Sequence, residues 1–263
     1  MPVRLVTWNV NSIRLRLNGL AQLVQALRPD VLCLQETKVA DGQFPAGALT
    51  ELGYDHLAIA GMKSYNGVAI ASRFPLTEVR TLNWCDREDC RHLVARTDGV
   101  DVHCLYVPSG GDVPDTELND KFAHKLDFLD ALGRWFARSG GPGQPVALLG
   151  DFNVAPLPTD VWSHKEMLNV VSHTPIEVAR LTALQASVAW VDAVRHFISP
   201  SQQLYTWWSY RAKDWAASDR GRRLDHVWVT PGLAGRLTGA MVVREARGWT
   251  QPSDHVPVMV DLA

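Results

Sequence analysis

Four short clusters of acidic, amide and imidazole side chains stand out in this chain of 263 residues. They are Trp8-Asn9-Val10-Asn11, Leu34-Gln35-Glu36-Thr37-Lys38, Gly150-Asp151-Phe152-Asn153 and Ser253-Asp254-His255-Val256-Pro257. Carboxylate and amide oxygens suit a hard divalent cation, and amide and imidazole groups can hold a phosphate. Together the clusters indicate a metal-dependent phosphoesterase.

Each cluster adjoins a short apolar run. The runs at residues 3–8, 31–34 and 146–149 precede the first three clusters, and the run at 256–260 follows the fourth. Runs this short, rich in Val and Leu and bounded by polar residues, predict buried strands. Because strand ends can converge on one rim of a sheet, where open α/β folds bind ligands, we expect the clusters to meet.

The chemistry of three residues follows from these positions. Glu36 comes at a strand end, where its carboxylate can bind Mg²⁺, which takes only one or two protein carboxylates. Asp151 can act as a general base, and the amide of Asn153 can donate to a phosphate oxygen. Gly150 is expected to let the backbone turn so that both point into one space. The alternative for Glu36 is an ordinary surface glutamate, and the alternative for the Gly150–Asn153 motif is an ordinary turn.

His255 has a possible partner in the run Arg223-Leu224-Asp225-His226. An aspartate at a strand start can accept from a histidine ring N–H, which fixes the tautomer and favours the cation. Asp225 and His255 lie far apart in the chain, so the pairing is a hypothesis, and His226 competes for Asp225.

A basic and aromatic segment spans residues 205–223. It contains Arg211, Lys213, Arg220, Arg222, Arg223, Trp207, Trp208, Tyr210 and Trp215. Such a mixture is typical of surfaces that contact phosphates and stack on sugars or bases. The alternative is that the tryptophans are core and the charges are solvated. The net charge of −2 does not decide between them.

Composition places the chain among soluble globular proteins, with 46% hydrophobic and 21% charged residues. No apolar stretch reaches the ~20 residues of a membrane span, and the N-terminus shows no signal-peptide pattern. We therefore expect no membrane association and a cytoplasmic location. Cys33 and Cys104 read as buried thiols of a reducing compartment. A zinc site at Cys85, Cys90 and His92 would lack a fourth ligand.

Strands and helices alternate along the whole chain. Helices are predicted at 17–27, 44–52, 121–137 and 174–185, and further strands at 67–72, 92–97, 100–106, 224–230 and 240–245. The glycine-rich breaks at 109–111 and 139–143 are too short to separate domains. We therefore expect one domain over residues 1–263, of class α/β, with two stacked mixed sheets flanked by helices.

With these residues laid out, the chain resembles the exonuclease III family of apurinic/apyrimidinic endonucleases, within the endonuclease/exonuclease/phosphatase superfamily. Nine motifs carry the resemblance, in one order along the chain: residues 7–14, 34–38, 65–69, 106–110, 121–122, 150–156, 205–211, 223–226 and 253–257. Asp160-Val161-Trp162 resembles the bacterial branch.

The resemblance implies a four-layered α/β sandwich and a Mg²⁺-dependent DNA repair enzyme, with Mn²⁺ as a substitute metal. The implied activities are incision 5′ of abasic sites in duplex DNA, 3′ to 5′ exonuclease action, and 3′-phosphatase and 3′-phosphodiesterase action. The implied partner is duplex DNA with abasic sites, nicks or 3′ ends. We expect a monomer, acting on the nucleoid.

The resemblance also implies roles for the clustered residues. Glu36 corresponds to the metal ligand, Asn11 lies beside the metal, and Asp254 is a second ligand or an orienting group. Asp151 activates water that Asn9 orients, Asn153 and Tyr106 contact the phosphate, and Asp225 orients His255 there. Position 11 departs from relatives that have Asp, which lowers the negative charge of the site.

The implied DNA contacts are Trp207, Arg211, Arg222, Leu224 and Lys121. Among them, Trp207 and Leu224 are expected to form an apolar pocket sized for a bare deoxyribose, with Arg222 at its edge. Such a pocket would exclude a sugar that still carries its base.

Two other functions compete. A superfamily phosphoesterase could act on a lipid head group or an inositol phosphate, which the motifs at 205–211 and 160–162 disfavour. A DNA-binding protein without catalytic activity would be expected to have lost at least one of Glu36, Asp151, Asn153 or His255, and all four are present.

Overall fold

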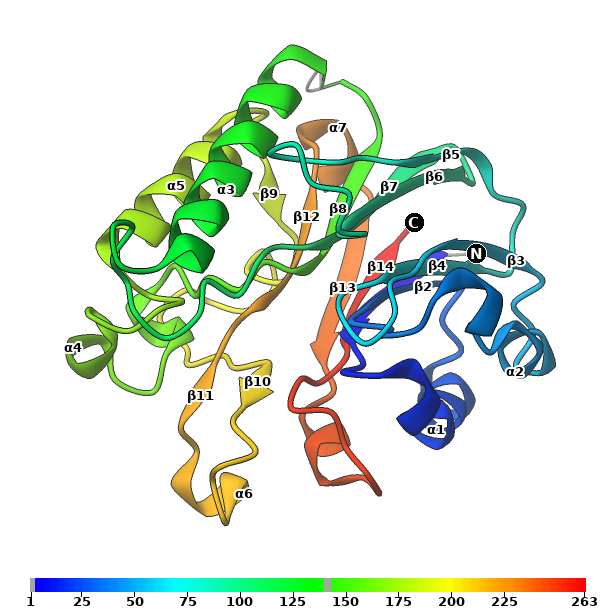
Figure 1. Ribbon diagram of the computed structural model, residues 1–263. Helices are drawn as coiled ribbons and strands as arrows, with labels where there is room; N and C mark the ends of the chain where they lie inside the picture. Colours follow the sequence, from blue (N-terminus) through cyan, green and yellow to red (C-terminus); the bar gives the residue numbers. More distant parts are fainter. Residues whose placement is uncertain (1–2, 140–142) are drawn as a thin grey trace.

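The computed structural model describes residues 3–139 and 143–263 and contains two six-stranded mixed sheets stacked on each other (Figure 1). The first sheet has the order β13-β14-β1-β2-β4-β3. Its strands are β1 (Val3–Asn9), β2 (Val31–Gln35), β3 (His56–Ala60), β4 (Val68–Ser72), β13 (Leu237–Val242) and β14 (Val258–Leu262). β1 is parallel to β2 and antiparallel to β14, so the sheet is mixed.

The second sheet has the order β5-β6-β7-β8-β12-β9. Its strands are β5 (Thr77–Thr81), β6 (His92–Thr97), β7 (Val100–Tyr106), β8 (Val146–Asp151), β9 (Val191–Asp192) and β12 (Asp225–Val229). β8 runs parallel to β7 and antiparallel to β12. A separate pair, β10 (Trp207–Trp208) and β11 (Gly221–Arg222), forms a small arm.

Helices cover the outer faces of both sheets (Figure 1). The first sheet carries α1 (Leu17–Leu27) and α2 (Ala46–Glu51), and the second carries α3 (Asp120–Ser139) and α5 (Pro175–Ala186). Shorter helices are α4 (His164–Met167), α6 (Trp215–Ser218) and α7 (Pro231–Ala234). The order helix, sheet, sheet, helix confirms the expected α/β sandwich of four layers. In the described part of the chain, no helix is long and apolar enough to cross a membrane.

Apolar side chains form three layers of core. In β2, Val31 and Cys33 point between the sheets, whereas Leu32 and Leu34 point toward α1. In β8, Leu149 faces the other sheet and Leu148 faces α3 and α5. The central strands are therefore buried on both faces, which explains why the sequence shows continuous apolar runs rather than alternation.

Several expected elements have shifted boundaries. The helix at 17–27 and the strands at 92–97 and 100–106 have the predicted boundaries. The helix expected at 44–52 begins at Ala46, and the strand expected at 240–245 covers 237–242, because residues 244–248 form a 3-10 helix. β14 begins at Val258 rather than 256, since Pro257 has no N–H for the sheet. Of the break at 139–143, residues 140–142 lie outside the described residues.

The strand ends that carry the clusters lie at one edge of the stacked sheets. Asn9 pairs with Gln35 at the ends of β1 and β2, and Tyr106 pairs with Asp151 at the ends of β7 and β8. Asp151 also lies opposite Asp225, the first residue of β12. This register places side chains from both sheets around one space.

Candidate active site

Asn9 joins the two sheets at this edge. Its Nδ2 donates to Glu36 Oε1 at 2.9 Å and to Asp151 Oδ2 at 2.9 Å. Its Oδ1 accepts from the backbone N–H of Asn11 at 3.0 Å. Because one buried amide contacts both carboxylates, the position of Glu36 is fixed relative to that of Asp151.

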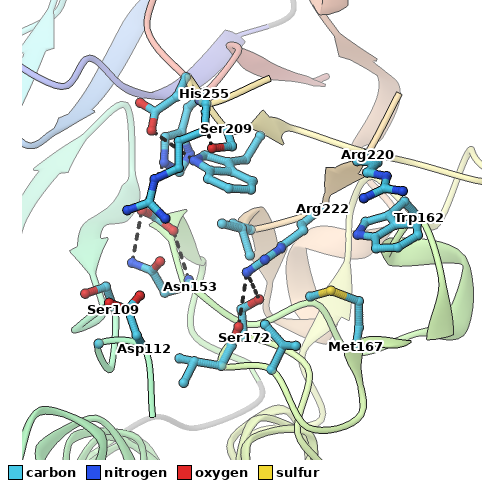
Figure 2. A pocket seen from close by; sticks show the side chains of 18 of the residues that line it. Ser109, Asp112, Asn153, Trp162, Met167, Ser172, Ser209, Arg220, Arg222 and His255 are labelled. Carbon is cyan, nitrogen blue, oxygen red and sulfur yellow. Dashed lines mark hydrogen bonds and ion pairs between the residues drawn. The ribbon is translucent and has the colours of Figure 1, made fainter. Parts of the chain in front are cut away.

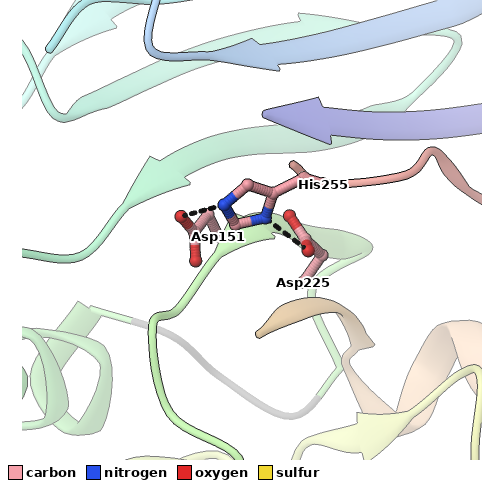
Figure 3. Close-up of side chains that lie close together, drawn as sticks. All are labelled: Asp151, Asp225 and His255. Carbon is pink, nitrogen blue, oxygen red and sulfur yellow. Dashed lines mark hydrogen bonds and ion pairs between the residues drawn. The ribbon is translucent and has the colours of Figure 1, made fainter. Parts of the chain in front are cut away.

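His255 lies between two carboxylates (Figure 3). Its Nδ1 is 2.8 Å from Asp225 Oδ2, and its Nε2 is 3.6 Å from Asp151 Oδ2. His226 instead bonds the backbone oxygen of Val154 through Nε2 at 2.9 Å, so His255 is the histidine that contacts Asp225. All three side chains are almost completely buried.

Burial and charge shift the pKa values of this group in defined directions. Burial raises the pKa of Asp151 to about 7, against the positive charge of His255, which favours the carboxylate. Burial alone would lower the pKa of His255, but the charges of Asp225 and Asp151 outweigh it and raise that pKa to about 10. At neutral pH His255 is therefore a cation beside a carboxylate that can still accept a proton.

The turn after β8 differs from the expectation. Gly150 lies within β8, and a Cβ there would approach Leu105 O to 1.8 Å, so the glycine is needed for close packing against β7. The turn follows Asp151, with Asn153 in the left-handed region at φ 53°. The Asn153 amide donates to Val107 O at 2.9 Å and to Asp151 Oδ2 at 3.1 Å. A phosphate would have to replace one of these bonds.

Tyr106 and Glu36 form a second contact between the sheets. The Tyr106 hydroxyl donates to Glu36 Oε1 at 2.8 Å, and burial together with the charge of Glu36 raises its pKa well above the usual range. It therefore remains a donor. Burial would raise the pKa of Glu36, but the charge of Lys38 and the N–H of Asn9 hold it below its usual value.

A cavity of about 680 Å³ opens beside these groups (Figure 2). Its lining includes Glu36, Tyr106, Asp151, Asn153, Asp254, His255, Trp207, Arg211, Arg222 and Leu224. Thirteen of the fourteen expected site residues either line this cavity or contact a residue that does, as Asn9, Asn11 and Asp225 do. Lys121 lies apart, in a neighbouring hollow that shares Tyr106 and Ser109 with the cavity.

Arg222 projects into the cavity (Figure 2). It pairs with Trp207 across the β10–β11 arm, and its guanidinium carbon lies 5.0 Å from the centre of the Trp207 ring. Its Nη1 donates to Val171 O at 3.1 Å and to Ser172 Oγ at 3.0 Å. Leu224 lines the same cavity and is 4% exposed.

A model of the Endonuclease/Exonuclease/phosphatase family matches residues 6–255. The chain belongs to this family. The exodeoxyribonuclease III of Haemophilus influenzae is 28% identical over 268 residues, an alignment that covers 98% of this chain and 99% of that protein.

Two solved structures of family proteins superpose closely. An AP endonuclease from Archaeoglobus fulgidus gives a TM-score of 0.91 at 32% identity, and a 3′ phosphatase from Neisseria bound to a product DNA hairpin gives 0.90 at 32% identity. Each match covers 99% of both chains. These likenesses confirm the family and the fold that the motifs implied.

The residues of this family member fit a divalent cation on the Glu36 side of the site. The ammonium of Lys38 lies 2.7 Å from Glu36 Oε2 and 2.5 Å from Asn11 Oδ1, so these oxygens already surround a positive charge. Asn11 Nδ2 also bonds Asp254 Oδ1 at 2.9 Å. Carboxylate and amide oxygens with room for water are the donors that Mg²⁺ prefers.

A second group of possible ligands fits a metal less well. Asp151, Asp225 and His255 offer ligand atoms within 4.8 Å of one another. The Nδ1 of His255 is already bonded to Asp225, however, and its Nε2 faces Asp151. Since Mg²⁺ favours oxygen over imidazole nitrogen, a hydrogen-bonded histidine explains this group better.

Motif reasoning missed several residues that hold the site together. Thr206 Oγ1 donates to Asp225 Oδ2 at 2.6 Å, and Ser253 Oγ donates to Asn9 O at 2.7 Å. Lys38, in the motif at residues 34–38, contacts Glu36 and Asn11. A small hydroxyl inside an otherwise aromatic or acidic motif is the signal that could have identified Thr206 and Ser253.

The zinc alternative does not agree with the contacts of His92. Its Nδ1 accepts from Trp84 Nε1 at 3.3 Å, and its Nε2 is 2.9 Å from His103 Nδ1. Both ring nitrogens are therefore used. Cys85 is exposed and Cys90 half-buried, whereas Cys33 and Cys104 are buried thiols as expected.

Proposed function

We propose that this protein is a Mg²⁺-dependent phosphodiesterase of DNA repair. It incises duplex DNA 5′ of abasic sites, degrades 3′ ends and removes 3′-blocking phosphates and phosphodiesters. A DNA repair nuclease is supported by relatives named exodeoxyribonuclease III, AP endonuclease and 3′ phosphatase. The observation that carries the proposal is His255, held between Asp225 and Asp151 at the end of a cavity whose oxygen donors fit a divalent cation.

Asp151 is proposed to take the proton from the attacking water. Its Oδ2 accepts from Asn9 and Asn153, and its Oδ1 accepts from the backbone N–H of Asn153 at 2.9 Å. These donors fix the carboxylate, while a pKa raised to about 7 by burial makes it a stronger base than an exposed aspartate. A positioned base of this kind suits phosphoryl transfer to water.

His255 is proposed to stabilise the charge that develops on the phosphate. The hydrogen bond to Asp225 fixes the ring, because Nδ1–H is then the donor and Nε2–H points toward Asp151 and the cavity. A fixed cation costs no reorganisation when the transition state forms.

Glu36, Asn11 and Asp254 are proposed to hold the cation, with Mn²⁺ able to replace Mg²⁺. When bound, the cation would supply charge neutralisation at the phosphate oxygens. Tyr106 and Asn153 would offer hydrogen bonds on the same side once the phosphate replaces their present partners. Lys38 would then have to move away from Glu36 and Asn11.

Trp207 and Leu224 are proposed to receive the sugar of an abasic nucleotide, with Arg222 above them. Extruding such a nucleotide costs less than extruding a paired one, since no base is unstacked. Arg211 at the cavity and Lys121 in the neighbouring hollow would contact phosphates on either side. We further propose a monomer that acts on the nucleoid in the cytoplasm.

The test is an assay of purified protein on three end-labelled duplexes: abasic, blunt undamaged and nicked with a 3′-phosphate. Each is incubated with Mg²⁺, with Mn²⁺ or with a chelator. We expect metal-dependent products from all three. If no duplex is cleaved while a lipid head group or inositol phosphate is hydrolysed, the DNA assignment is wrong.

A further inference from the structure

A buried ion pair lies behind the wall of the cavity. It joins Lys125 of α3 to Glu177 of α5, and both side chains are completely buried. Burying two charges has a desolvation cost that the pair's attraction often fails to exceed, and apolar residues could hold two helices together as well. Packing of α3 on α5 therefore does not explain why this position is charged.

The other contacts of Lys125 point to the active site. Its ammonium donates to Asn153 O at 2.7 Å and to Ser109 O at 3.3 Å, in addition to the Glu177 carboxylate. A lysine has three donors, so all of them are used. Gly110 at φ 87° packs on its stem, since a Cβ there would come within 2.9 Å of Lys125 Cδ. Lys125 thus holds two loops that line the cavity.

Glu177 holds a third loop, which contains Ser172 and Thr174. Its carboxylate accepts from the backbone N–H of Ser172 at 2.9 Å and from the backbone N–H of Thr174 at 3.1 Å. It also accepts from the Thr174 hydroxyl at 2.7 Å. Ser172 in turn accepts from Arg222, the residue that projects into the cavity. The carboxylate therefore fixes the loop to which Arg222 is bonded.

We infer that Lys125 and Glu177 are positioning residues that fix the phosphate side of the cavity relative to its sugar side. Neither reaches the cavity. Their effect passes through the backbone of Asn153 and Ser109 on one side, and through Ser172 and Arg222 on the other. The inference rests on the proposed function in one respect only, that the cavity binds the abasic nucleotide.

The test compares the double variant Lys125→Met/Glu177→Gln with Leu132→Ala. The double variant leaves no unpaired charge, and the amide oxygen that Glu177→Gln introduces is still an acceptor for Ser172 and Thr174. Leu132 is a buried residue further along α3, in the core beneath it, and its truncation measures the effect of lost stability alone. Melting temperature, kcat and KM on an abasic duplex are measured for each, together with amide exchange over residues 107–111 and 171–174.

We expect the double variant to lose roughly tenfold to a hundredfold in kcat, as small misplacements of catalytic groups do. Amide exchange in both loops should be faster. Leu132→Ala should melt at a lower temperature with kcat nearly unchanged. A double variant with wild-type kcat and exchange would overturn the inference, as would one whose loss only matches that of Leu132→Ala.

Two further outcomes remain informative: an inactive wild-type protein and a double variant that does not fold. An inactive wild-type protein would refute the proposed function, and the exchange of the two loops would still test the positioning role. If the double variant does not fold, Lys125→Met alone serves, because Glu177 keeps its donors from Ser172 and Thr174 and can be neutralised by a proton. Unchanged kcat and unchanged exchange in that variant would overturn the inference.

Discussion

The carboxylate of Asp151 has two amide donors and a cationic neighbour 3.6 Å away, which is the setting of a base rather than of a surface acid. Asp151→Asn keeps the size and removes the proton acceptor. We expect turnover on an abasic duplex to fall by about 10²- to 10⁴-fold, the usual contribution of a general base, with DNA affinity retained. Single-turnover rates and equilibrium binding on one preparation check this, and near-wild-type turnover would assign the water to another group.

Variants of Asp225 and His255 can show whether Asp225 acts by orienting the His255 ring or through its own negative charge. If Asp225 only fixes the ring, Asp225→Asn should be milder than His255→Ala, which removes the cation itself. The comparison uses kcat on the abasic duplex at saturating Mg²⁺. A larger loss for Asp225→Asn would mean that its negative charge matters more than the position of the ring.

Glu36 is the carboxylate assigned to the cation. Glu36→Gln should raise the Mg²⁺ concentration for half-maximal activity at least roughly tenfold, a loss that even the outer partners of metal ligands produce. Glu166→Gln is the matched control, since Glu166 lines the same cavity from α4 and is exposed. Identical Mg²⁺ titrations for wild type and Glu36→Gln would remove Glu36 from the metal site.

The sequence predicts which residues form the site, but not which hydrogen bonds those residues make. Glu36, Asp151, Asn153 and His255 could be selected because each adjoins a buried run. The contact of Asn9 with two carboxylates could not be predicted from the sequence. It forms between two sheets, and no local sequence pattern encodes how the sheets stack. The Lys125–Glu177 pair was missed for a related reason, since both residues look like the polar face of an amphipathic helix.

The β10–β11 arm carries the proposed substrate preference. Trp207→Ala should reduce abasic incision about tenfold or more relative to 3′-phosphatase activity, within the range that one apolar pocket contributes to selectivity. The 3′-phosphatase reaction needs no extruded sugar. Trp215→Ala, a tryptophan of the same arm outside the cavity lining, is the control.

The competing explanation is that Trp207 is a core residue. Its loss would then cost ~3 to 5 kcal/mol of stability and reduce every activity together. Trp207 is only half-buried, and its Nε1 donates to Asp254 Oδ2 at 3.0 Å. The melting temperature of the variant, measured on the same preparation, shows whether losing these contacts destabilises the fold. Equal losses of both activities at an unchanged melting temperature would refute the sugar pocket.

Elements buried on both faces were the predictable ones. The apolar runs at 31–34 in β2 and 146–149 in β8 are continuous. β1 and β7 contain two polar residues each within their runs but remain mostly apolar, so the existence and approximate boundaries of all four strands follow from the sequence. β3, β5 and the two-residue strands β9, β10 and β11 were not predicted. β5 is exposed along its whole length and β9 is only two residues long, and tertiary pairing rather than apolar patterning makes them strands.

Three buried histidines make the stability of the whole molecule depend on pH. Burial lowers the pKa of His103 to about 3, that of His226 to about 4, and that of His92 well below 6.5. The unfolded chain takes up protons below pH 6.5 while these rings stay neutral in the folded protein. Stability is therefore present above pH 6.5 and falls below it, by up to about 1.4 kcal/mol per pH unit for each ring.

Urea unfolding at about pH 7.5, 6.0 and 5.0 measures this dependence. His103→Gln removes one titrating ring and keeps an acceptor for His92, so its stability should fall less steeply with acid than that of the wild type. The raised pKa of His255 adds stability that is constant below pH 6.5 and is lost as pH rises toward 10. The pKa of about 7 of Asp151 adds stability as pH falls through 7, which offsets part of the histidine effect equally in both proteins, so the difference between their slopes reports His103. Equal slopes for the two proteins would contradict the assignment.

The expected single domain over residues 1–263 stays a prediction, although side chains of both sheets share one apolar layer. That layer is what brings Asn9 and Glu36 of one sheet against Asp151 and Tyr106 of the other. The proposed enzyme therefore depends on the stacking of the sheets as much as on the motifs.

The most direct test of the central claim is the position and metal dependence of the cut in an abasic duplex. With excess protein and Mg²⁺, we predict that the first product, before any degradation from the new 3′ end, is an incision 5′ of the lesion that leaves a 3′-hydroxyl. We predict no product with a chelator and only trace product from Asp151→Asn. A cut on the 3′ side of the lesion, a cut of equal rate in chelator, or full activity of Asp151→Asn would contradict the account.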